Sequence, residues 1–372
     1  MKLRKFWKYK YSGSIYGIEI ADINGNGKEE IIAYSKTGVL IVISQNGKLL
    51  YHRIISKNSP IWHSKIYDID NDGKNELILG GMDGILRIFK CDLKYNLKSL
   101  WNHKFDSSIS GILIDDINND NIDELIVFSL DKSLRVLNPL NGDLIWGQVF
   151  EDGIGDAIIF IDTKNNSKKE IIACGNDGTI RCFDGIDGSL LWFKTFSNKV
   201  RCVSFLNSVK GIVLLVGGDD KVLHILDKAT QKEFKIIKFK DFVWKCISYP
   251  KCVFNNAIIS SYSFDYFKNL IAIEKVKFTS KIICLNEIFE VKWELKGYNC
   301  EFIKIIKFQE KLFILLGTTK GELLIVDPEI GKILFKIQHD SCINMIQFLE
   351  EQRIIINCYD DGSIYAYNLE DF

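Results

Sequence analysis

The sequence feature that most constrains the fold of this chain is an internal repeat of about 46 residues. Four Asp-rich segments, each followed by an apolar run, align at Asp22, Asp68, Asp116 and Asp162, with steps of 46, 48 and 46 residues. An aromatic residue after an apolar pair recurs eight times, at Trp7, Tyr51, Trp101, Trp146, Trp192, Phe234, Trp293 and Phe335. Repeats of this length that hold four antiparallel strands are typical of β-propeller blades.

Each repeat consists of short apolar runs separated by turn residues. The fourth repeat contains GDAIIFID, EIIACG, TIRCFD and SLLWFKTF, bounded by Asn, Asp, Gly and Lys. This pattern predicts strands, and no segment of the sequence shows the periodicity of an amphipathic helix. We therefore expect an all-β chain that forms a single closed β-propeller over residues 1–372.

The two ends of the chain indicate how many blades there are. The last repeat supplies only three strands, and the N-terminal segment KFWKYKY resembles LLWFKTF in the fourth repeat. We expect the N-terminal strand to complete the last blade, which removes an exposed sheet edge. The predicted blades are 13–56, 57–106, 107–151, 152–197, 198–238, 239–296, 297–338, and 339–372 with 4–12.

Residues 239–296 form a repeat that is about a dozen residues longer than the mean of 46.5. An extended hairpin that projects from blade 6 explains the extra length, and so does a misplaced blade boundary. A propeller of seven blades is therefore the alternative to eight.

Composition and charge narrow the class of protein. Apolar residues make up 47% of the chain, which is enough for a large core. The 48 basic residues balance the 48 acidic ones, which argues against binding to nucleic acid or to an anionic membrane. The sequence lacks an apolar run long enough to span a membrane, and its start lacks the apolar core of a signal peptide. The ten scattered cysteines are typical of reduced core residues, and we expect a cytoplasmic protein.

Two parts of the repeat resemble known propeller families. DINGNGKEEII and DIDNDGKNELILGG resemble the FG-GAP and VCBS-type repeats of integrin α-chain propellers. DGTIRCFDGIDGSLLW and DKSLRVLNPLNGDLIW resemble the repeats of PQQ-type quinoproteins and of the outer-membrane barrel-assembly lipoprotein. Similar combinations occur in intracellular adaptor propellers, including the FG-GAP-containing subunit of a lysosomal nutrient-sensing complex and the Bardet-Biedl complex propellers. The resemblance implies a propeller fold.

The Asp-rich loops are candidate calcium sites, because alternating oxygen ligands can converge on one cation when a turn and a closing carboxylate follow. The candidate ligands are Asp68, Asp70, Asp72 and Glu76 in loop 2, Asp116, Asn118, Asp120 and Glu124 in loop 3, and Asp22, Asn24, Asn26 and Glu30 in loop 1. Calcium is expected in loops 2 and 3 first, since loop 1 has only two formal charges. Loop 4 has Lys164 at the second ligand position and is expected to be metal-free.

A structural interpretation of the same loops needs no metal. Asp and Asn side chains can cap the backbone of their own turn, and Glu30, Glu76, Glu124 and Glu170 then mark where the second strand of each blade begins. The recurrence of this Glu in loop 4 favours the structural role.

No catalytic constellation is visible in the sequence. It contains no G-x-S-x-G motif, no P-loop and no dinucleotide fingerprint, and we expect a protein that is not an enzyme. The less periodic aromatic residues are more informative. Trp62, Phe242, Trp244 and Tyr298 are placed on loops opposite the Asp-rich loops, where large aromatic side chains are typical anchors of a protein interface. The alternative is that Trp62 and Trp244 start the inner strands and point between blades.

These observations favour a non-catalytic scaffold that binds other proteins as a subunit of a larger assembly. A quinoprotein-type propeller that binds a small molecule in its central channel is a second hypothesis, although no vicinal cysteine pair marks a quinone site. A third is a calcium-braced adhesion propeller, which would need an export signal.

Overall fold

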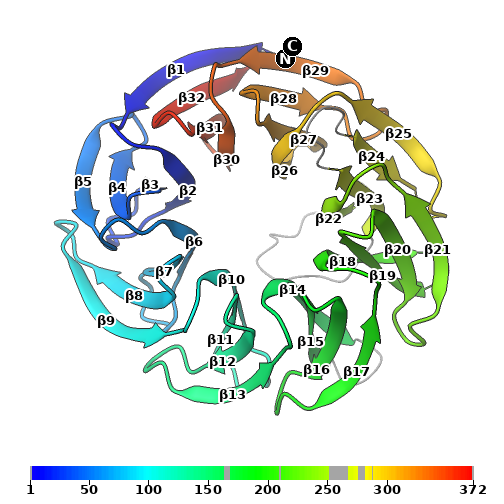
Figure 1. Cartoon of the computed structure of the whole chain (residues 1–372). Coiled ribbons are helices and arrows are strands. Elements are labelled where there is room, and N and C mark those ends of the chain that lie inside the picture. The colour runs from blue at the N-terminus through cyan, green and yellow to red at the C-terminus, as the bar shows by residue number, and fades with distance from the viewer. Residues whose placement is uncertain are drawn as a thin grey trace.

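The chain forms a ring of eight four-stranded antiparallel sheets in the computed structural model (Figure 1). The structure describes residues 2–162, 168–208, 211–250, 267–274, 281–286 and 288–370. Within these ranges every regular element is a strand, so no helix there is long and apolar enough to cross a membrane. The expected all-β propeller is confirmed, and the described strands form eight blades.

The blades follow one another along the chain, and each begins at the ring axis and ends at the rim (Figure 1). Blades 1 and 2 contain β2 (Ile15–Ala21), β3 (Glu30–Ser35), β4 (Val39–Ser44), β5 (Leu49–Ile54), β6 (Ile61–Tyr67), β7 (Glu76–Gly81), β8 (Ile85–Cys91) and β9 (Leu97–Lys104). Blades 3 and 4 contain β10 (Ile109–Asp115), β11 (Glu124–Ser129), β12 (Ser133–Leu137), β13 (Leu144–Val149), β14 (Ile154–Asp162), β15 (Lys168–Gly175), β16 (Thr179–Asp184) and β17 (Leu190–Thr195). Blades 5 and 6 contain β18 (Val200–Ser208), β19 (Gly211–Gly218), β20 (Val222–Asp227), β21 (Glu233–Lys238), β22 (Val243–Pro250), β23 (Phe267–Glu274), β24 (Lys281–Leu285) and β25 (Val291–Lys296). Blades 7 and 8 contain β26 (Cys300–Phe308), β27 (Lys311–Thr318), β28 (Glu322–Val326), β29 (Ile333–Gln338), β30 (Ile343–Leu349), β31 (Ile354–Tyr359), β32 (Ser363–Glu370) and β1 (Lys2–Lys10).

The position of a strand in its blade explains its hydrophobic pattern. The second strands β3, β7 and β11 are buried at every residue, because a neighbouring blade covers each of their faces. Continuous apolar runs such as EIIAYS and ELILGG therefore suit them. The outermost strands alternate between exposed and half-buried residues, as β17 does. The core of the molecule consists of apolar layers between adjacent sheets.

The N-terminal strand closes the ring. β1 pairs with β32 along the outer edge of blade 8, from Lys2 opposite Glu370 to Lys10 opposite Ser363. The backbone N–H of Tyr11 donates to the carbonyl of Gly362 at 2.9 Å, which extends this contact beyond the strand. The first and last segments of the chain are thus parts of one sheet, as the sequence predicts.

The recurring aromatic residues pack between blades. Trp101 Nε1 on β9 donates to the carbonyl of Pro139 at 2.9 Å, in the turn between β12 and β13 of the next blade. The indole also lies against Gly142, whose φ is +78°, and a Cβ there would be 2.6 Å from the ring. Equivalent indole N–H bonds run from Trp7 to Gln45, from Trp146 to Gly185 and from Trp293 to Pro328. These four tryptophans therefore pack one blade against the next.

Blade 6 has the same four strands as its neighbours. β23 and β24 are its two middle strands and pair from Leu270 opposite Leu285 to Glu274 opposite Lys281. The connection at 251–266 and the turn at 275–280 lie outside the described residues, as does the predicted extension of this blade.

Candidate functional site

Every inner strand has a β-bulge at its second residue. In β2, for example, Ile15 pairs with Ser35 and Gly17 pairs with Tyr34, so that Tyr16 has no partner on β3. The same shift occurs once near the start of all eight inner strands. Bulges re-aim a side chain and leave its residue outside the ladder. The bulged residues are Tyr16, Trp62, Ser110, Gly155, Arg201, Trp244, Glu301 and Asn344, which we call the bulge ring.

The bulge ring occupies one face of the propeller. All inner strands run in the same direction along the ring axis, so their first residues meet at one face and the Asp-rich loops lie at the other (Figure 1). We call these the bulge face and the carboxylate face. Every member of the bulge ring is half-buried, so each contacts the propeller and also faces solvent.

The residue types in the bulge ring differ from blade to blade, although their backbone position does not. The residue immediately before each bulge is Ile, Val or Cys and is at most 2% exposed. The bulged residue itself is aromatic, cationic, anionic, polar or Gly. The eight repeats can thus be compared with one another at equivalent backbone positions. Packing alone would favour one residue type at the bulge, as it favours a small set of apolar residues at the position before it.

Two aromatic clusters stand on opposite sides of the ring axis. In the first, the rings of Tyr16 and Trp62 are stacked with centroids 6.5 Å apart, and Lys36 Nζ lies 5.8 Å from the centroid of Tyr16. These residues belong to blades 1 and 2, across the axis from blades 5 and 6 (Figure 1).

The second cluster combines aromatic rings with a fixed cation. Phe242 and Trp244 meet edge to face with centroids 6.1 Å apart. The guanidinium of Arg201 lies 5.9 Å from the Phe242 centroid and donates two hydrogen bonds to Asp219, at 2.7 and 2.8 Å. This bidentate pair raises the pKa of Arg201 and holds its planar group in place.

Polar members of the bulge ring connect neighbouring blades. Ser110 Oγ donates to the carbonyl of Ile154 at 2.6 Å, and Asn344 Nδ2 donates to the carbonyl of Ile15 at 2.7 Å. Beside Asn344 lies a cavity of about 270 Å³ lined by Tyr16, Lys36, Glu301, Cys342, Asn344 and Asp360. The bulge face therefore combines aromatic and charged groups with hydrogen bonds between neighbouring blades.

Of the four predicted anchors, the structure brings Phe242 and Trp244 into contact, and it places Trp62 in the cluster across the axis. Trp62 and Trp244 are members of the bulge ring, and Phe242 directly precedes β22. Tyr298 lies two residues before β26 and packs against the core between blades 6 and 7. Lys336 Nζ is 5.6 Å from its ring centroid. Tyr298 thus lies in a different environment from the other three anchors.

Sequence reasoning missed Tyr16, Arg201 and Asn344. The signal that could have found them is positional, because each directly follows the first buried apolar residue of an inner strand, as Trp62 and Trp244 do. Their different chemistry hides this equivalence until the bulges align them.

The Asp-rich loops on the carboxylate face share one capping network. In loop 2, Asp68 accepts hydrogen bonds from the backbone N–H groups of Asp72 at 3.1 Å and Gly73 at 2.8 Å. Glu76 at the start of β7 accepts one from the backbone N–H of Ile69 at 3.0 Å. The same bonds recur in loop 1 with Asp22 and Glu30, and in loop 3 with Asp116 and Glu124. These contacts are the ones expected for the structural interpretation of the loops.

A lysine lies at the centre of the loop 2 carboxylates. Asp68, Asp70 and Glu76 place carboxylate oxygens within 4.8 Å of one another. Lys90 Nζ on β8 lies 2.8 Å from Asp70, 2.6 Å from Asp72 and 3.2 Å from Glu76. Although burial lowers the pKa of Lys90, the three carboxylates raise it well above its usual range. This ammonium supplies the positive charge that these carboxylates need, so a calcium ion in loop 2 would have to displace it.

Loops 1 and 3 use neutral donors instead. In loop 3, Asn118 Nδ2 donates to Glu124 Oε1 at 2.8 Å and to Asp120 at 3.0 Å. In loop 1, the Tyr95 hydroxyl donates to Glu30 Oε1 at 3.0 Å. A calcium ion in loop 3 would need the Asn118 amide to turn its oxygen inward.

Calcium binding by loops 1, 2 and 3 stays a prediction that isothermal titration of calcium into the purified protein tests. In loop 4, Lys164 lies outside the described residues. Glu170 is described, two residues after the start of β15, and forms an ion pair with Lys228 at 2.5 Å.

The fold and the bulge ring define this chain as a β-propeller with one structurally distinct face, and its described strands form eight blades. A family model described as KICSTOR complex protein kaptin matches residues 55–142, and one described as the lambda-carrageenase β-propeller domain matches residues 139–245. Each match covers less than half of the chain, so both support the propeller and neither assigns a family.

Solved propeller structures resemble the whole chain. Sqt1 from Saccharomyces cerevisiae has a TM-score of 0.77 at 11% identity, with 100% of both chains covered. The computationally designed Ika8 protein has a TM-score of 0.71 at 13% identity, with 97% of this chain and 98% of that one covered. BamB from Moraxella catarrhalis has a TM-score of 0.67 at 13% identity, with 99% of this chain and 100% of that one covered. At such identities the likeness shows the fold alone. No curated protein sequence matches the chain significantly.

Proposed function

We propose that this propeller is a non-catalytic, cytoplasmic scaffold that binds another protein with its bulge face, as a subunit of a larger assembly. The observation that carries the proposal is the bulge ring, in which residue type varies at a constant backbone position beside a uniformly apolar one. Half-buried tryptophans and a bidentate arginine are typical anchors of protein interfaces.

The mechanism is rigid presentation. A closed ring holds the two aromatic clusters at fixed positions on opposite sides of its axis, so that a partner orders few groups of the propeller when it binds. The partial match to the model of kaptin, which is named as a protein of the KICSTOR complex, supports a role in an assembly.

Affinity purification from the native cell followed by mass spectrometry tests this proposal. We expect Trp62→Ala with Trp244→Ala to lose the captured partner while the melting temperature changes by only a few degrees. Phe6→Ala with Phe193→Ala is the matched control, since those rings are 45% and 61% exposed on outer strands. An unchanged set of partners in the tryptophan variant contradicts the proposal, and a collapse of stability instead assigns both tryptophans to the core.

A further inference from the structure

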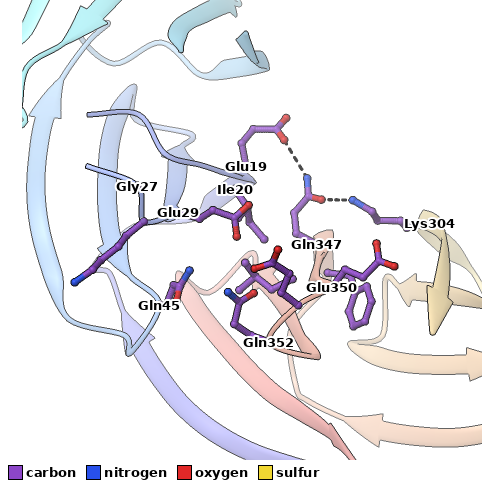
Figure 2. Close-up of a pocket in the computed structure, with 13 residues that line it drawn as sticks. Glu19, Ile20, Gly27, Glu29, Gln45, Lys304, Gln347, Glu350 and Gln352 are labelled. Carbon is purple, nitrogen blue, oxygen red and sulfur yellow. Dashed lines mark hydrogen bonds between the residues drawn. The ribbon is translucent and has the colours of Figure 1, made fainter. Parts of the chain in front are cut away.

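A second concave surface lies on the carboxylate face, where blades 1 and 8 meet beside blade 7 (Figure 2). Its volume is about 630 Å³, within the range of protein ligand pockets. The lining comes from the end of β2, the loop that precedes β3, the turn between β4 and β5, the end of β30 with the turn that follows it, and one residue of β26. This pocket is separate from the bulge ring, because it lies at the other end of the inner strands.

The floor of the pocket is a chain of hydrogen bonds across four inner strands. Ser64 Oγ donates to Glu19 at 3.2 Å, and Gln347 Nε2 donates to Glu19 at 3.1 Å and to the carbonyl of Ile18 at 3.0 Å. Lys304 Nζ donates to Gln347 Oε1 (Figure 2). Burial raises the pKa of Glu19 and lowers that of Lys304. The hydrogen bond to Gln347 holds the ammonium of Lys304 at the floor of the pocket.

The rim of the pocket carries carboxylates that lack such partners. Glu29 comes from the loop of blade 1, and Glu350 comes from the facing turn of blade 8 (Figure 2). Glu351 is the next residue of that turn and also lines the pocket. Among the residues that the structure describes, none forms an ion pair or side-chain hydrogen bond with these three carboxylates. Burial, and then the charges of Glu351 and Asp22, raise the pKa of Glu29, which means that like charges meet at the rim.

We propose that this pocket receives a basic side chain, an arginine or lysine on an extended segment of the partner protein. Four carboxylates and two ammonium groups, those of Lys28 and Lys304, line the pocket. Gln347 engages Lys304 at the floor, which leaves three rim carboxylates against the single ammonium of Lys28. Charge complementarity thus calls for a cation at the rim, and a guanidinium can bridge two carboxylates. Solvent-exposed ion pairs are individually weak, so a free small amine gains little there, whereas a side chain on a docked protein adds the contacts of its neighbours.

This inference rests on the proposed function and names the chemistry of the partner at a second point of contact. The test measures fluorescence anisotropy of a fluorescein-labelled peptide, Gly-Ser-Arg-Gly-Arg-Ser-Gly, titrated with the full chain at low salt. We expect Glu29→Gln, Glu350→Gln and Glu351→Gln together to weaken binding at least tenfold. A peptide with citrulline in place of arginine should not bind, because it keeps the shape and loses the charge.

The control is a second triple variant with the same change in net charge, Asp106→Asn, Glu151→Gln and Glu290→Gln, on exposed residues away from the pocket. It should bind the arginine peptide within twofold of the wild type. Equal loss in both triple variants, or equal binding of the citrulline peptide, overturns the inference. The inference is also overturned if spermine binds more tightly than the peptide and the pocket variant loses that binding, because the ligand is then a small amine.

Two further measurements separate the outcomes. The triple variant of Glu29, Glu350 and Glu351 should melt no lower than the wild type, because it removes the repulsion between these carboxylates. A large fall in its melting temperature would show that the carboxylates stabilise the fold and would overturn the inference. Trp62→Ala with Trp244→Ala should keep wild-type affinity for the peptide. If the double tryptophan variant also keeps its protein partners, the proposed function fails. The peptide titration then still shows whether the pocket binds a basic side chain.

Discussion

At the scale of single residues, the three Asp-rich loops show how one backbone network tolerates different partners. The closing glutamate of each loop accepts a backbone N–H with one oxygen, and its other oxygen faces Tyr95, Lys90 or Asn118. Loop 2 has the most formal charge, and it is the loop in which a lysine lies among the carboxylates. Either a lysine side chain or a bound metal ion can offset the repulsion between these carboxylates.

Replacing Lys90 should expose this repulsion. We expect Lys90→Met to lower the free energy of unfolding by about 2 kcal/mol, because it leaves the buried Glu76 without its counter-charge while the other pairs are partly solvated. Millimolar calcium should restore much of this loss, since the emptied cluster then has room for a cation. Thermal melts with and without calcium check the result, with Lys98→Met on the neighbouring strand as the control. A Lys90 variant as stable as the wild type would contradict this account of loop 2.

Glu124 in loop 3 should make stability depend on pH. Burial, and then the charges of Asp120 and Asp116, raise its pKa to about 7, although the Ile117 N–H bond lowers it. The unfolded value is about 4.3, so the folded state binds more protons between these two values and loses stability as pH rises through that window. We expect Glu124→Gln to melt higher than the wild type at about pH 8 and equally at about pH 4. A difference that does not change with pH would show that charge is not the cause.

The residues of the candidate site were only partly predictable from the sequence. Trp62 and Trp244 could be found because tryptophan at a loop is conspicuous, whereas Arg201 and Tyr16 depend on a bulge that only strand pairing reveals. Lys90 was missed for the same reason. It lies 14 residues after Glu76 and reaches the cluster because the two residues pair across β7 and β8.

At the scale of elements, the contact between an outer strand and the next blade is the repeated unit of assembly. Trp101 on β9 both donates to the turn after β12 and lies flat against its glycine. Two features favour glycine at position 142: its backbone has a positive φ, and a Cβ there would clash with the indole. The recurring aromatic residue of one blade therefore requires a glycine in a turn of the next blade, as Trp146 does at Gly188.

Gly142→Ala separates these two requirements. We expect it to cost about 2 kcal/mol more than Gly297→Ala, because both residues have positive φ, of +78° and +85°, but only Gly142 faces an indole. Urea denaturation of the two variants measures the difference. Equal losses would mean that backbone strain alone explains the glycine at position 142.

The sequence also predicted elements better than connections. The four strands of a repeat can be predicted because each has a characteristic burial pattern, continuous in the second strand and alternating in the outermost one. In blade 6 the strands are harder to assign, since only Thr279 and Ser280 separate the strand-like runs NLIAIEKVKF and KIICLNEI, and the long connection before β23 carries no Asp-rich landmark.

At the scale of the whole molecule, the geometry of the bulge face depends on closure of the ring. Blade 8 contains the first and last strands of the chain, and its apolar layer against blade 1 includes Ile356, Ile364 and Ile31, with Trp7 packed beside them. Trp7 Nε1 also donates to Gln45 of blade 1 at 2.6 Å. The bulge face keeps its geometry only while this layer holds, because every inner strand is positioned by its neighbours.

Hydrogen exchange measured by mass spectrometry on the intact chain tests this closure most directly. The β1 amides that bond to β32 should exchange as slowly as those of β31 and β32, because one cooperative opening exposes them all. If residues 2–10 instead exchange within seconds while the rest of blade 8 stays protected, the ring is not sealed by its first strand, and the rigid bulge face proposed here has no structural basis.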